Sequence, residues 1–328
     1  MDAGFRTALL SSRRTHATGW QSPNPTSIFN AVTTPDGMRV AFQGELGAYA
    51  EHAIQLLFGP SSVPVPFPTY LEAVAATENG SVDRAVLPIE NTLVGSDGAA
   101  HEAIDRAPSL HAVAETIVEV HHCLLAPRGA TLDTIATVLS HSVALLQCQE
   151  FFRTHPRMQT HGVFDTAAAA REVSQLGDPS FAAVASPAAA GRFALDVVVE
   201  DIGDRRDNQT RFIALARDPA SPAIGAPVRT MIRFTTADVP GALLAALQPF
   251  ADHHVNLRRI DTHPTGEPWS YRFFLEFDHE VGNPHVDAAI AAASRKTAAM
   301  RVIGTFPRWK AGRRGSIGWK PTDTSVSA

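Results

Sequence analysis

The sequence predicts an α/β protein with a largely parallel sheet, followed by a smaller ferredoxin-like module. Three observations support this prediction. Short apolar runs alternate with segments of helical spacing over residues 38–217. Residues 218–227 then hold three prolines and a glycine, which is typical of a linker. Over residues 228–308 the expected order of elements changes to βαββαβ, which indicates a second domain of the ferredoxin-like type.

Turn and cap residues divide the first domain into elements. Gly44 closes the first apolar run, the pair Asn79-Gly80 ends a helix, and Asp165 is placed to cap another helix with its carboxylate. The expected strands are 38–42, 84–89, 116–126, 135–139, 181–185, 197–199 and 213–216, and the expected helices are 49–58, 70–79, 96–106, 145–154, 167–175 and 187–193. The second domain is expected to have strands at 228–235, 255–263, 269–278 and 301–306, and helices at 240–253 and 285–296.

Composition limits the classes of function. The 328 residues are 45% hydrophobic, which is enough for two domains with cores of their own. The net charge of -5 argues against a nucleic-acid partner, and no apolar run reaches the ~20 residues of a membrane span. Cys123 and Cys148 lie in apolar contexts and suggest buried thiols in a reducing compartment, so we expect a cytoplasmic protein. Residues 1–37 have the Arg-, Ser- and Thr-rich composition of a transit peptide but no amphipathic stripe. We interpret them as a disordered extension and residues 309–328 as a flexible tail.

Polar clusters lie at the ends of expected strands, and ligands of parallel sheets collect at strand ends. Each cluster alone can be a helix cap or a turn, but together they favour a site for a small polycarboxylate. Within the last cluster, Thr210 offers a hydroxyl and Arg211 an anion-binding guanidinium. No metal-ligand spacing or dinucleotide fingerprint is present, so we expect neither metal nor cofactor. The clusters are 43–45, 90–92, 140–142, 165–166 and 208–211.

The chain resembles the prephenate dehydratase family, including arogenate dehydratases, followed by an ACT regulatory domain. Six stretches carry this resemblance, which spans about residues 38–308, and their order and spacing agree with the family. They are Phe42–Tyr49, Val86–Thr92, Val120–Ala126, Ser140-His141 with Gln147-Cys148, Asp165–Ala169, and Asn208–Phe212.

The resemblance implies two α/β lobes like those of a periplasmic binding protein, with the site between them. It implies that Thr210 is the catalytic residue. It also implies a substrate site that includes Asn91, Ser140, Gln147, Thr166, Arg211 and Phe212. The implied reaction is the cofactor-independent loss of water and CO2 from prephenate to give phenylpyruvate, in L-phenylalanine biosynthesis. Two alternatives stay open: the same chemistry on arogenate, and a non-catalytic, amino-acid-sensing protein with two lobes.

The sequence also departs from the family pattern. The usual Ser-His-Pro-Gln is Ser140–Val143 here, which motivates the non-catalytic alternative. In the ACT domain the usual Glu-Ser-Arg-Pro is replaced, and the change of Arg to His263 removes a permanent cation. We therefore expect phenylalanine inhibition to be weak or altered and, if His263 takes part, sensitive to pH near neutrality. A site shared between chains implies a homodimer or homotetramer. The effector residues expected are Gly241, Ala242, Leu243, Asp261, Thr262, His263 and Pro264.

Overall fold

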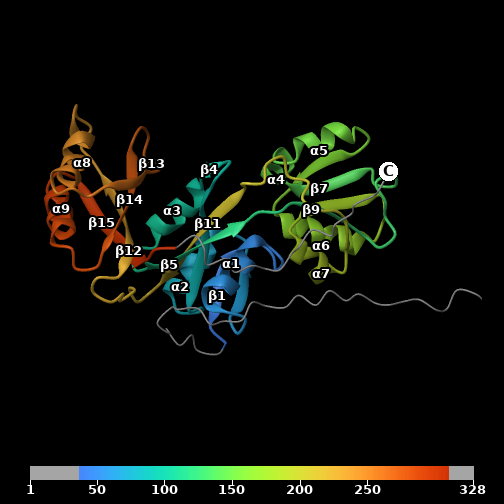
Figure 1. Cartoon of the computed structure of the whole chain (residues 1–328), viewed down its shortest axis with the longest axis horizontal. Coiled ribbons are helices and arrows are strands. Elements are labelled where there is room, and N and C mark those ends of the chain that lie inside the picture. The colour runs from blue at the N-terminus through green and yellow to red at the C-terminus, as the bar shows by residue number, and fades with distance from the viewer. Residues whose placement is uncertain (1–36, 310–328) are drawn as a thin grey trace, which may run out of the picture. The chain divides into compact units, whose positions relative to one another are not determined.

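A computed structural model describes residues 37–309 (Figure 1). The extension expected at 1–37 and the tail expected at 309–328 lie outside the described residues, apart from one residue each. The first sheet has the order β2-β1-β3-β11-β5, with the short β4 (Gly95–Ser96) paired to β3. Its strands are β1 (Arg39–Gln43), β2 (Val63–Phe67), β3 (Arg84–Asn91), β5 (His111–Glu119) and β11 (Gln209–Ala216), and its helices are α1 (Tyr49–Phe58), α2 (Tyr70–Glu78) and α3 (Gly98–Arg106).

A second sheet follows, with the order β10-β6-β9-β7-β8. Both sheets are mixed rather than largely parallel, which corrects the expectation from the sequence. The chain leaves the first sheet after β5 and returns as β11, which runs antiparallel between β3 and β5. The strands of the second sheet are β6 (Cys123–Ala126), β7 (Thr137–His141), β8 (Gln159–Val163), β9 (Phe181–Ala185) and β10 (Asp196–Val199), and its helices are α4 (Ser142–Leu146), α5 (Gln149–Thr154), α6 (Thr166–Leu176) and α7 (Pro187–Phe193).

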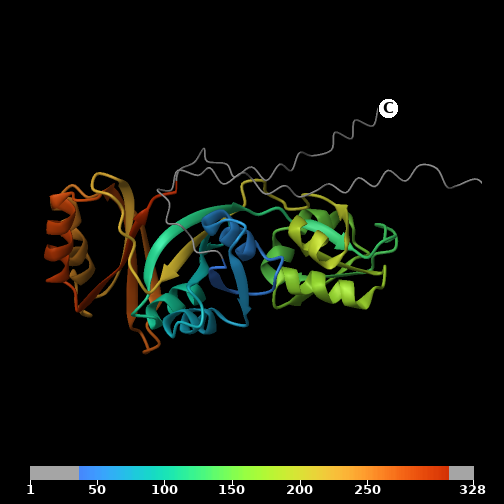
Figure 2. The ribbon, with the colours of Figure 1, turned by 90° about the horizontal axis from the view of Figure 1, so that it is seen from below.

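The C-terminal part confirms the predicted βαββαβ order, with an antiparallel sheet ordered β13-β14-β12-β15. Figure 2 shows both of its helices on one face of this sheet and the N-terminal part of the chain on the other. The predicted fold class, two α/β lobes and a ferredoxin-like module, is thereby confirmed. The elements are β12 (Pro227–Thr235), α8 (Ala242–Asp252), β13 (Leu257–Pro264), β14 (Tyr271–Glu280), α9 (Pro284–Ser294) and β15 (Ala299–Pro307).

The C-terminal sheet shares a hydrophobic core with the first sheet. Met231, Phe274 and Phe306 from the C-terminal sheet are buried in the same cluster as Ile213 of β11. Gly304 of β15 lies so close to β5 that a Cβ atom there would stand 2.1 Å from the carbonyl oxygen of Ala112. A glycine is therefore required at this contact, because any side chain would push the two strands apart.

Two local expectations differ from the structure. The helix expected at 145–154 is divided into α4 and α5, which meet at Gln147 and Cys148. Gln147 lies at this break and makes the contacts described below. His121 and His122 lie in the connection between β5 and β6 rather than inside a strand. None of the helices among residues 37–309 is long and apolar enough to cross a membrane.

Candidate active site

The candidate site lies where β11 begins. Thr210 in β11 is paired with Asn91 of β3 on one side and with Val118 of β5 on the other. The register between β11 and β3 shifts immediately after Arg211, so a bulge adjoins the polar end of the strand. Bulges of this kind re-aim side chains and are common next to active sites. The local sequence therefore holds the Thr210 hydroxyl on a rigid strand at a sheet terminus.

A chain of hydrogen bonds joins the Thr210 hydroxyl to the second lobe. Asn91 Nδ2 donates to Thr210 Oγ1 at 3.0 Å and to Asn208 Oδ1 at 2.8 Å. Asn208 Nδ2 donates to Gln147 Oε1 at 3.0 Å. His122 Nε2 lies 2.8 Å from the same Gln147 oxygen. Asn208 and His122 are both buried, so the network is shielded from water over much of its length.

Two backbone amides determine the orientation of every group in this network. Asn91 Oδ1 accepts from the backbone N–H of Leu93 at 2.9 Å and of Val94 at 3.2 Å, so its NH2 group must face Asn208 and Thr210. Asn208 must then present its oxygen to Asn91 and its NH2 group to Gln147. Because the Gln147 oxygen accepts that bond, His122 must be protonated on Nε2 to donate to it. Thr210 thus accepts a hydrogen bond, and its own proton can be donated to a bound substrate.

Burial keeps the network in this state. Desolvation lowers the pKa of His122 below its ordinary value, although the bond to Gln147 opposes the shift, so the ring is neutral near pH 7. Tyr49 lies on the other side of this ring, and its hydroxyl donates to the backbone oxygen of His121 at 2.5 Å. Desolvation raises the pKa of Tyr49. His122 is thus buried and hydrogen-bonded, while the neighbouring His121 is partly exposed.

The turn after β1 approaches the second lobe closely. Gly44 has a φ of +114°, and a Cβ there would stand 2.9 Å from Asp165 Oδ2, so the position favours glycine for both reasons. Asp165 caps α6 by accepting from Ala167 N at 2.8 Å, and burial raises the pKa of its carboxyl group. Ser186 Oγ donates to the backbone oxygen of Gly47 at 2.8 Å. The two lobes are therefore joined by these contacts as well as by the Thr210 network.

The structure brings only some of the predicted substrate residues together. Asn91, Gln147 and Thr210 belong to one network. Thr166 is partly exposed at the first position of α6. Ser140 is fully buried and donates to the backbone oxygen of Val184 at 2.6 Å, so its hydroxyl is used inside the second sheet. Phe212 is buried among apolar side chains of the first lobe and packs there instead of facing a ligand.

Arg211 is the clearest departure from the sequence expectation. Its side chain is 7% exposed and forms ion pairs with Glu90, Glu115 and Glu276. Consecutive residues of a strand point to opposite faces, so a guanidinium next to Thr210 must point away from the Thr210 hydroxyl. The structure therefore does not support the expected role of Arg211 as a substrate clamp. Glu276 is the residue that sequence reasoning missed here, since nothing in its local sequence singles it out.

Three further residues were not named individually as site residues, although Asn208 belongs to the predicted cluster 208–211. Asn208 and His122 complete the network between Gln147 and Asn91, and Tyr49 lies against His122. A signal existed for each of them, because all three fall in the stretches that carry the family resemblance. Their roles follow only from the fold, which brings together residues that are far apart in the chain.

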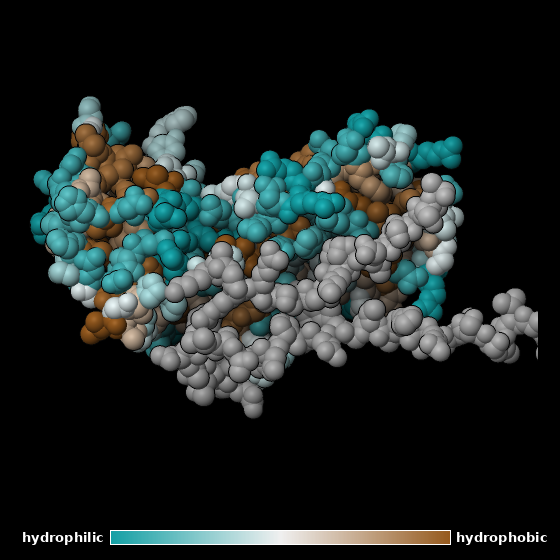
Figure 3. Space-filling model, viewed as in Figure 1, coloured by the Kyte–Doolittle hydropathy of each residue, from teal (hydrophilic) through white to brown (hydrophobic). Residues whose placement is uncertain are grey.

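The expected effector residues divide between two regions. Gly241 and Ala242 line a surface pocket of about 430 Å³ that also includes residues 295–298. A neighbouring pocket of about 590 Å³ lies between α8 and the start of β13, and includes Leu244 and Leu257. Figure 3 shows apolar residues at the surface around α8. Leu243, at the start of α8, is 36% exposed. Thr262 and Pro264 are exposed on β13.

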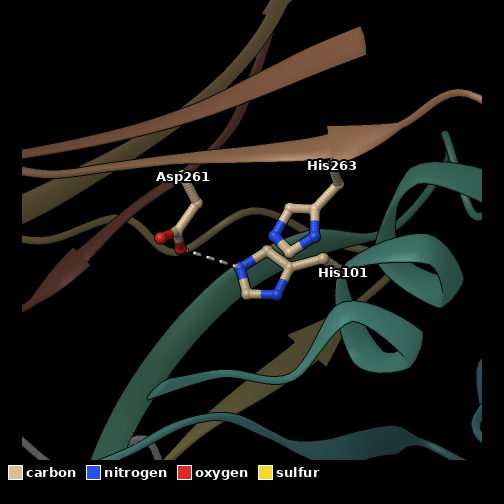
Figure 4. Close-up of side chains that lie close together, drawn as sticks. All are labelled: His101, Asp261 and His263. Carbon is tan, nitrogen blue, oxygen red and sulfur yellow. Dashed lines mark ion pairs between the residues drawn. The ribbon is translucent and has the colours of Figure 1, made fainter. Parts of the chain in front are cut away.

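Asp261 and His263 instead face α3 (Figure 4). The His263 ring stacks on the buried His101 ring, with centroids 4.6 Å apart and planes at 21°. Ser96 Oγ donates to Asp261 Oδ2 at 3.2 Å. Desolvation by the surrounding protein lowers the pKa of His263 from its ordinary value. Direct contact of these two residues with an effector is therefore not supported by their placement.

Asp261, His263 and His101 also place three potential metal-ligand atoms within 4.8 Å of one another. Their arrangement does not suit a metal ion. The lone pairs of nearly parallel, stacked rings cannot converge on a single ion at the ~2.0–2.1 Å typical of zinc–nitrogen bonds. Arg259 also contacts the Asp261 carboxylate and brings a fixed positive charge to the same place. These residues are better explained as a polar contact between β13 and α3.

The fold and the site define a class: an α/β catalytic unit of two lobes, with a hydroxyl held by a directional network, joined to a small regulatory module. Comparisons with known proteins agree. Residues 40–220 match the model of the prephenate dehydratase family, and residues 230–295 match that of the ACT domain. The chain is 35% identical to arogenate dehydratase/prephenate dehydratase 2, chloroplastic, of Arabidopsis thaliana, over 87% of this chain and 77% of the relative.

Two solved structures are similar over most of the chain. The prephenate dehydratase of Arthrobacter aurescens in complex with L-Phe aligns with a TM-score of 0.74 and 30% identity, over 82% of this chain and 90% of that one. GqqA, described as a novel type of quorum quenching acylase, aligns with a TM-score of 0.75 and 30% identity, over 83% and 98%. The chain belongs to the prephenate dehydratase family, and its expected class, a carbon–oxygen lyase of L-phenylalanine biosynthesis, is confirmed at the level of the family.

One expectation from the sequence is wrong. A cytoplasmic location was expected from the two buried cysteines, but the similar relatives from Arabidopsis thaliana are named as chloroplastic proteins. Buried thiols report a reducing environment, and they do not distinguish the cytosol from other reducing compartments.

Proposed function

We propose that this chain converts prephenate to phenylpyruvate, with Thr210 as the residue that assists the departing hydroxyl. The observation that supports this role most directly is the fixed orientation of the network. Asn91 Nδ2 donates to Thr210 Oγ1, so the Thr210 proton can point toward a ligand. A positioned donor of this kind stabilises negative charge that develops on a leaving oxygen.

The reaction needs little from the protein beyond position and polarity. The bond to the departing carboxylate breaks and its electron pair enters the ring, while the C–O bond at C4 breaks and its oxygen takes a proton. The products are phenylpyruvate, CO2 and water, and aromatisation provides the driving force. A free threonine hydroxyl is a weak acid, so we assign Thr210 polarisation of the leaving hydroxyl and not full proton transfer before the bond breaks. Thr166, at the start of α6, remains our candidate for a contact to a substrate carboxylate.

Arogenate is the second candidate substrate. It differs from prephenate by an amino group in place of the keto oxygen, so the departing groups and the role of Thr210 are the same. The observation in its favour is that the relative from Arabidopsis thaliana carries both names, arogenate dehydratase and prephenate dehydratase. The two reactions differ in their products, phenylpyruvate and phenylalanine, and can be measured separately.

Steady-state kinetics of the purified chain with each substrate tests this proposal. We expect turnover of at least one of the two, and a fall in kcat of about 10²-fold in Thr210→Val, which keeps the shape and removes the hydroxyl. Thr210→Ser should restore most of the activity because it restores a hydroxyl. An inactive wild type that still binds both substrates would favour the non-catalytic alternative. Wild-type kcat in Thr210→Val would remove Thr210 from the mechanism.

We also propose that phenylalanine binds to the C-terminal domain. The ACT match and the complex of the Arthrobacter aurescens prephenate dehydratase with L-Phe support this. The pocket at Gly241 and Ala242 offers the start of α8, where backbone N–H groups suit a carboxylate. Assembly as a homodimer or homotetramer remains our prediction, because exposed apolar residues such as Leu244 and Val239 surround these pockets.

A further inference from the structure

The residue that follows Thr210 is joined to the C-terminal domain by a buried ion pair. Arg211 Nη1 and Nη2 donate to the two oxygens of Glu276 in β14, each at 2.7 Å. Both side chains are nearly inaccessible to solvent, with Arg211 7% and Glu276 1% exposed. A bidentate pair of this kind has a fixed geometry, since two parallel hydrogen bonds leave little freedom of rotation or translation.

Other charges hold this pair in place from both domains. Glu115 of β5 accepts from Arg211 at 3.0 Å and from Arg229 of β12 at 3.2 Å. Arg259 of β13 donates to Glu276 at 3.1 Å. Burial pushes the pKa of Glu276 upward, but the hydrogen bond and the charge of Arg211 outweigh it and the pKa is lowered overall. Arg211 and Glu276 are therefore both ionised at neutral pH, and separating them would cost each buried charge its bidentate partner.

The ion pair involves the residue next to Thr210, so its position also affects the Thr210 hydroxyl. Thr210 and Arg211 are adjacent in β11, so their side chains lie on opposite faces of the first sheet. The Arg211 side chain is fixed to Glu276, and the register of β11 against β3 shifts at this residue. A small movement of Glu276 would therefore move the Thr210 hydroxyl relative to Asn91 and to a bound substrate.

We propose that Glu276 is a positioning residue for catalysis: through its pair with Arg211, the C-terminal domain sets the place of Thr210. This inference rests on the proposed function of Thr210. The same pair would allow a ligand of the C-terminal domain to affect the site. This requires that the ligand bind with different affinity to two states of the protein that differ in the position of β14. The shared hydrophobic core and the close contact of Gly304 with Ala112 make the two domains move together at this point.

The test compares two substitutions on the same strand. Glu276→Gln keeps the shape of the side chain and removes the charge that pairs with Arg211. Asp278→Asn makes the same chemical change two residues away, where the carboxylate pairs with Arg229 at 2.8 Å and Arg308 at 3.1 Å, and not with Arg211. We expect Glu276→Gln to lower kcat by about 10- to 100-fold with KM within about 3-fold, because displacements of about 1 Å at a reacting group cost on this order. Asp278→Asn should leave both constants within about 2-fold.

Equal effects of the two substitutions on kcat would overturn the proposal, as would a lower melting temperature in Glu276→Gln with an unchanged kcat. If Glu276→Gln does not fold, Arg211→Lys gives the same answer, since it keeps the charge and loses the bidentate geometry. Its kcat should fall about 10-fold at a KM near that of the wild type, and an unchanged kcat would refute the positioning role. A wild type that turns over neither prephenate nor arogenate would instead refute the proposed function.

Discussion

Replacing the amide of Asn91 by a carboxylate is the sharpest test of the oriented network. In Asn91→Asp one oxygen should stay where Leu93 N and Val94 N donate to it, at 2.9 and 3.2 Å. The second oxygen then takes the place of Nδ2. It would stand about 2.8 Å from Asn208 Oδ1 and about 3.0 Å from Thr210 Oγ1, where the wild type has two donated hydrogen bonds.

The expected loss follows from these two contacts. The introduced carboxylate can only accept, so the Thr210 hydroxyl would donate its proton to it and not to the substrate. Loss of one positioned donor typically costs 10²–10³ in kcat, or about 2.7–4 kcal/mol. Asn208 would also have to turn its NH2 group toward the carboxylate, which breaks its bond to Gln147. We therefore predict a fall in kcat of at least about 10²-fold, with a smaller change in KM.

The assay is kcat as a function of pH, with Asn79→Asp as the matched control. Asn79 accepts from Ser81 N at 2.9 Å, a role that a carboxylate can take over, so this control should keep the kcat of the wild type. Activity of Asn91→Asp should rise as pH falls, because protonation of the introduced carboxylate restores one donor. A kcat within about 3-fold of the wild type at neutral pH would refute the orientation of the network.

Two further predictions concern other parts of the chain. Desolvation lowers the pKa of the fully buried His101 to about 4, so the stability it confers is complete above pH 6.5 and is lost as pH falls toward 4. Across these ~2.5 pH units the free energy of unfolding falls by about 3 kcal/mol because of His101. In His101→Phe, the free energy of unfolding measured with urea should therefore fall less steeply as pH decreases. Calorimetry should detect phenylalanine binding, with Kd within about 3-fold of wild type in His263→Arg, because His263 faces Ser96 and His101 rather than the pockets around α8. A change of more than 10-fold would return His263 to the effector site.

The sequence predicted most of the helices and strands because periodicity and turn chemistry are local properties, but it missed β2, β4 and β8. The βαββαβ module followed from alternating apolar runs, and the helix that begins at Thr166 followed from its Asp165 cap. The antiparallel insertion of β11 between β3 and β5 could not be predicted in this way. The place of β11 depends on backbone groups of β3 and β5 that no other strand pairs with. In the chain, β11 is separated from β5 by the whole second lobe. That topology determines which polar clusters meet.

The candidate site was predicted only in part, because the topology determines which polar side chains meet. Asn91 and Thr210 were predicted together because both follow or open a strand at a polar cluster, and the fold pairs them directly. Ser140 belongs to a similar cluster, but its hydroxyl is used by the Val184 carbonyl of a neighbouring strand, a partner that no local pattern indicates. Side chains at strand ends are thus predictable as polar, and their hydrogen-bond partners are set by contacts that are distant in sequence.

Arg211 shows how this limit bears on function. A guanidinium beside a catalytic hydroxyl suggests a substrate clamp when only the sequence is known. Strand geometry separates the two side chains, since Thr210 faces Asn91 and the second lobe while Arg211 faces Glu276 of the C-terminal domain. Two consecutive residues thereby join three parts of the molecule through one peptide unit. The strand β11 is fixed on one face by a buried ion pair and carries the Thr210 hydroxyl on the other face. A shift of the C-terminal domain would therefore move that hydroxyl. The dipeptide Thr210-Arg211 therefore links the C-terminal domain to the proposed chemistry through one peptide unit and one buried ion pair.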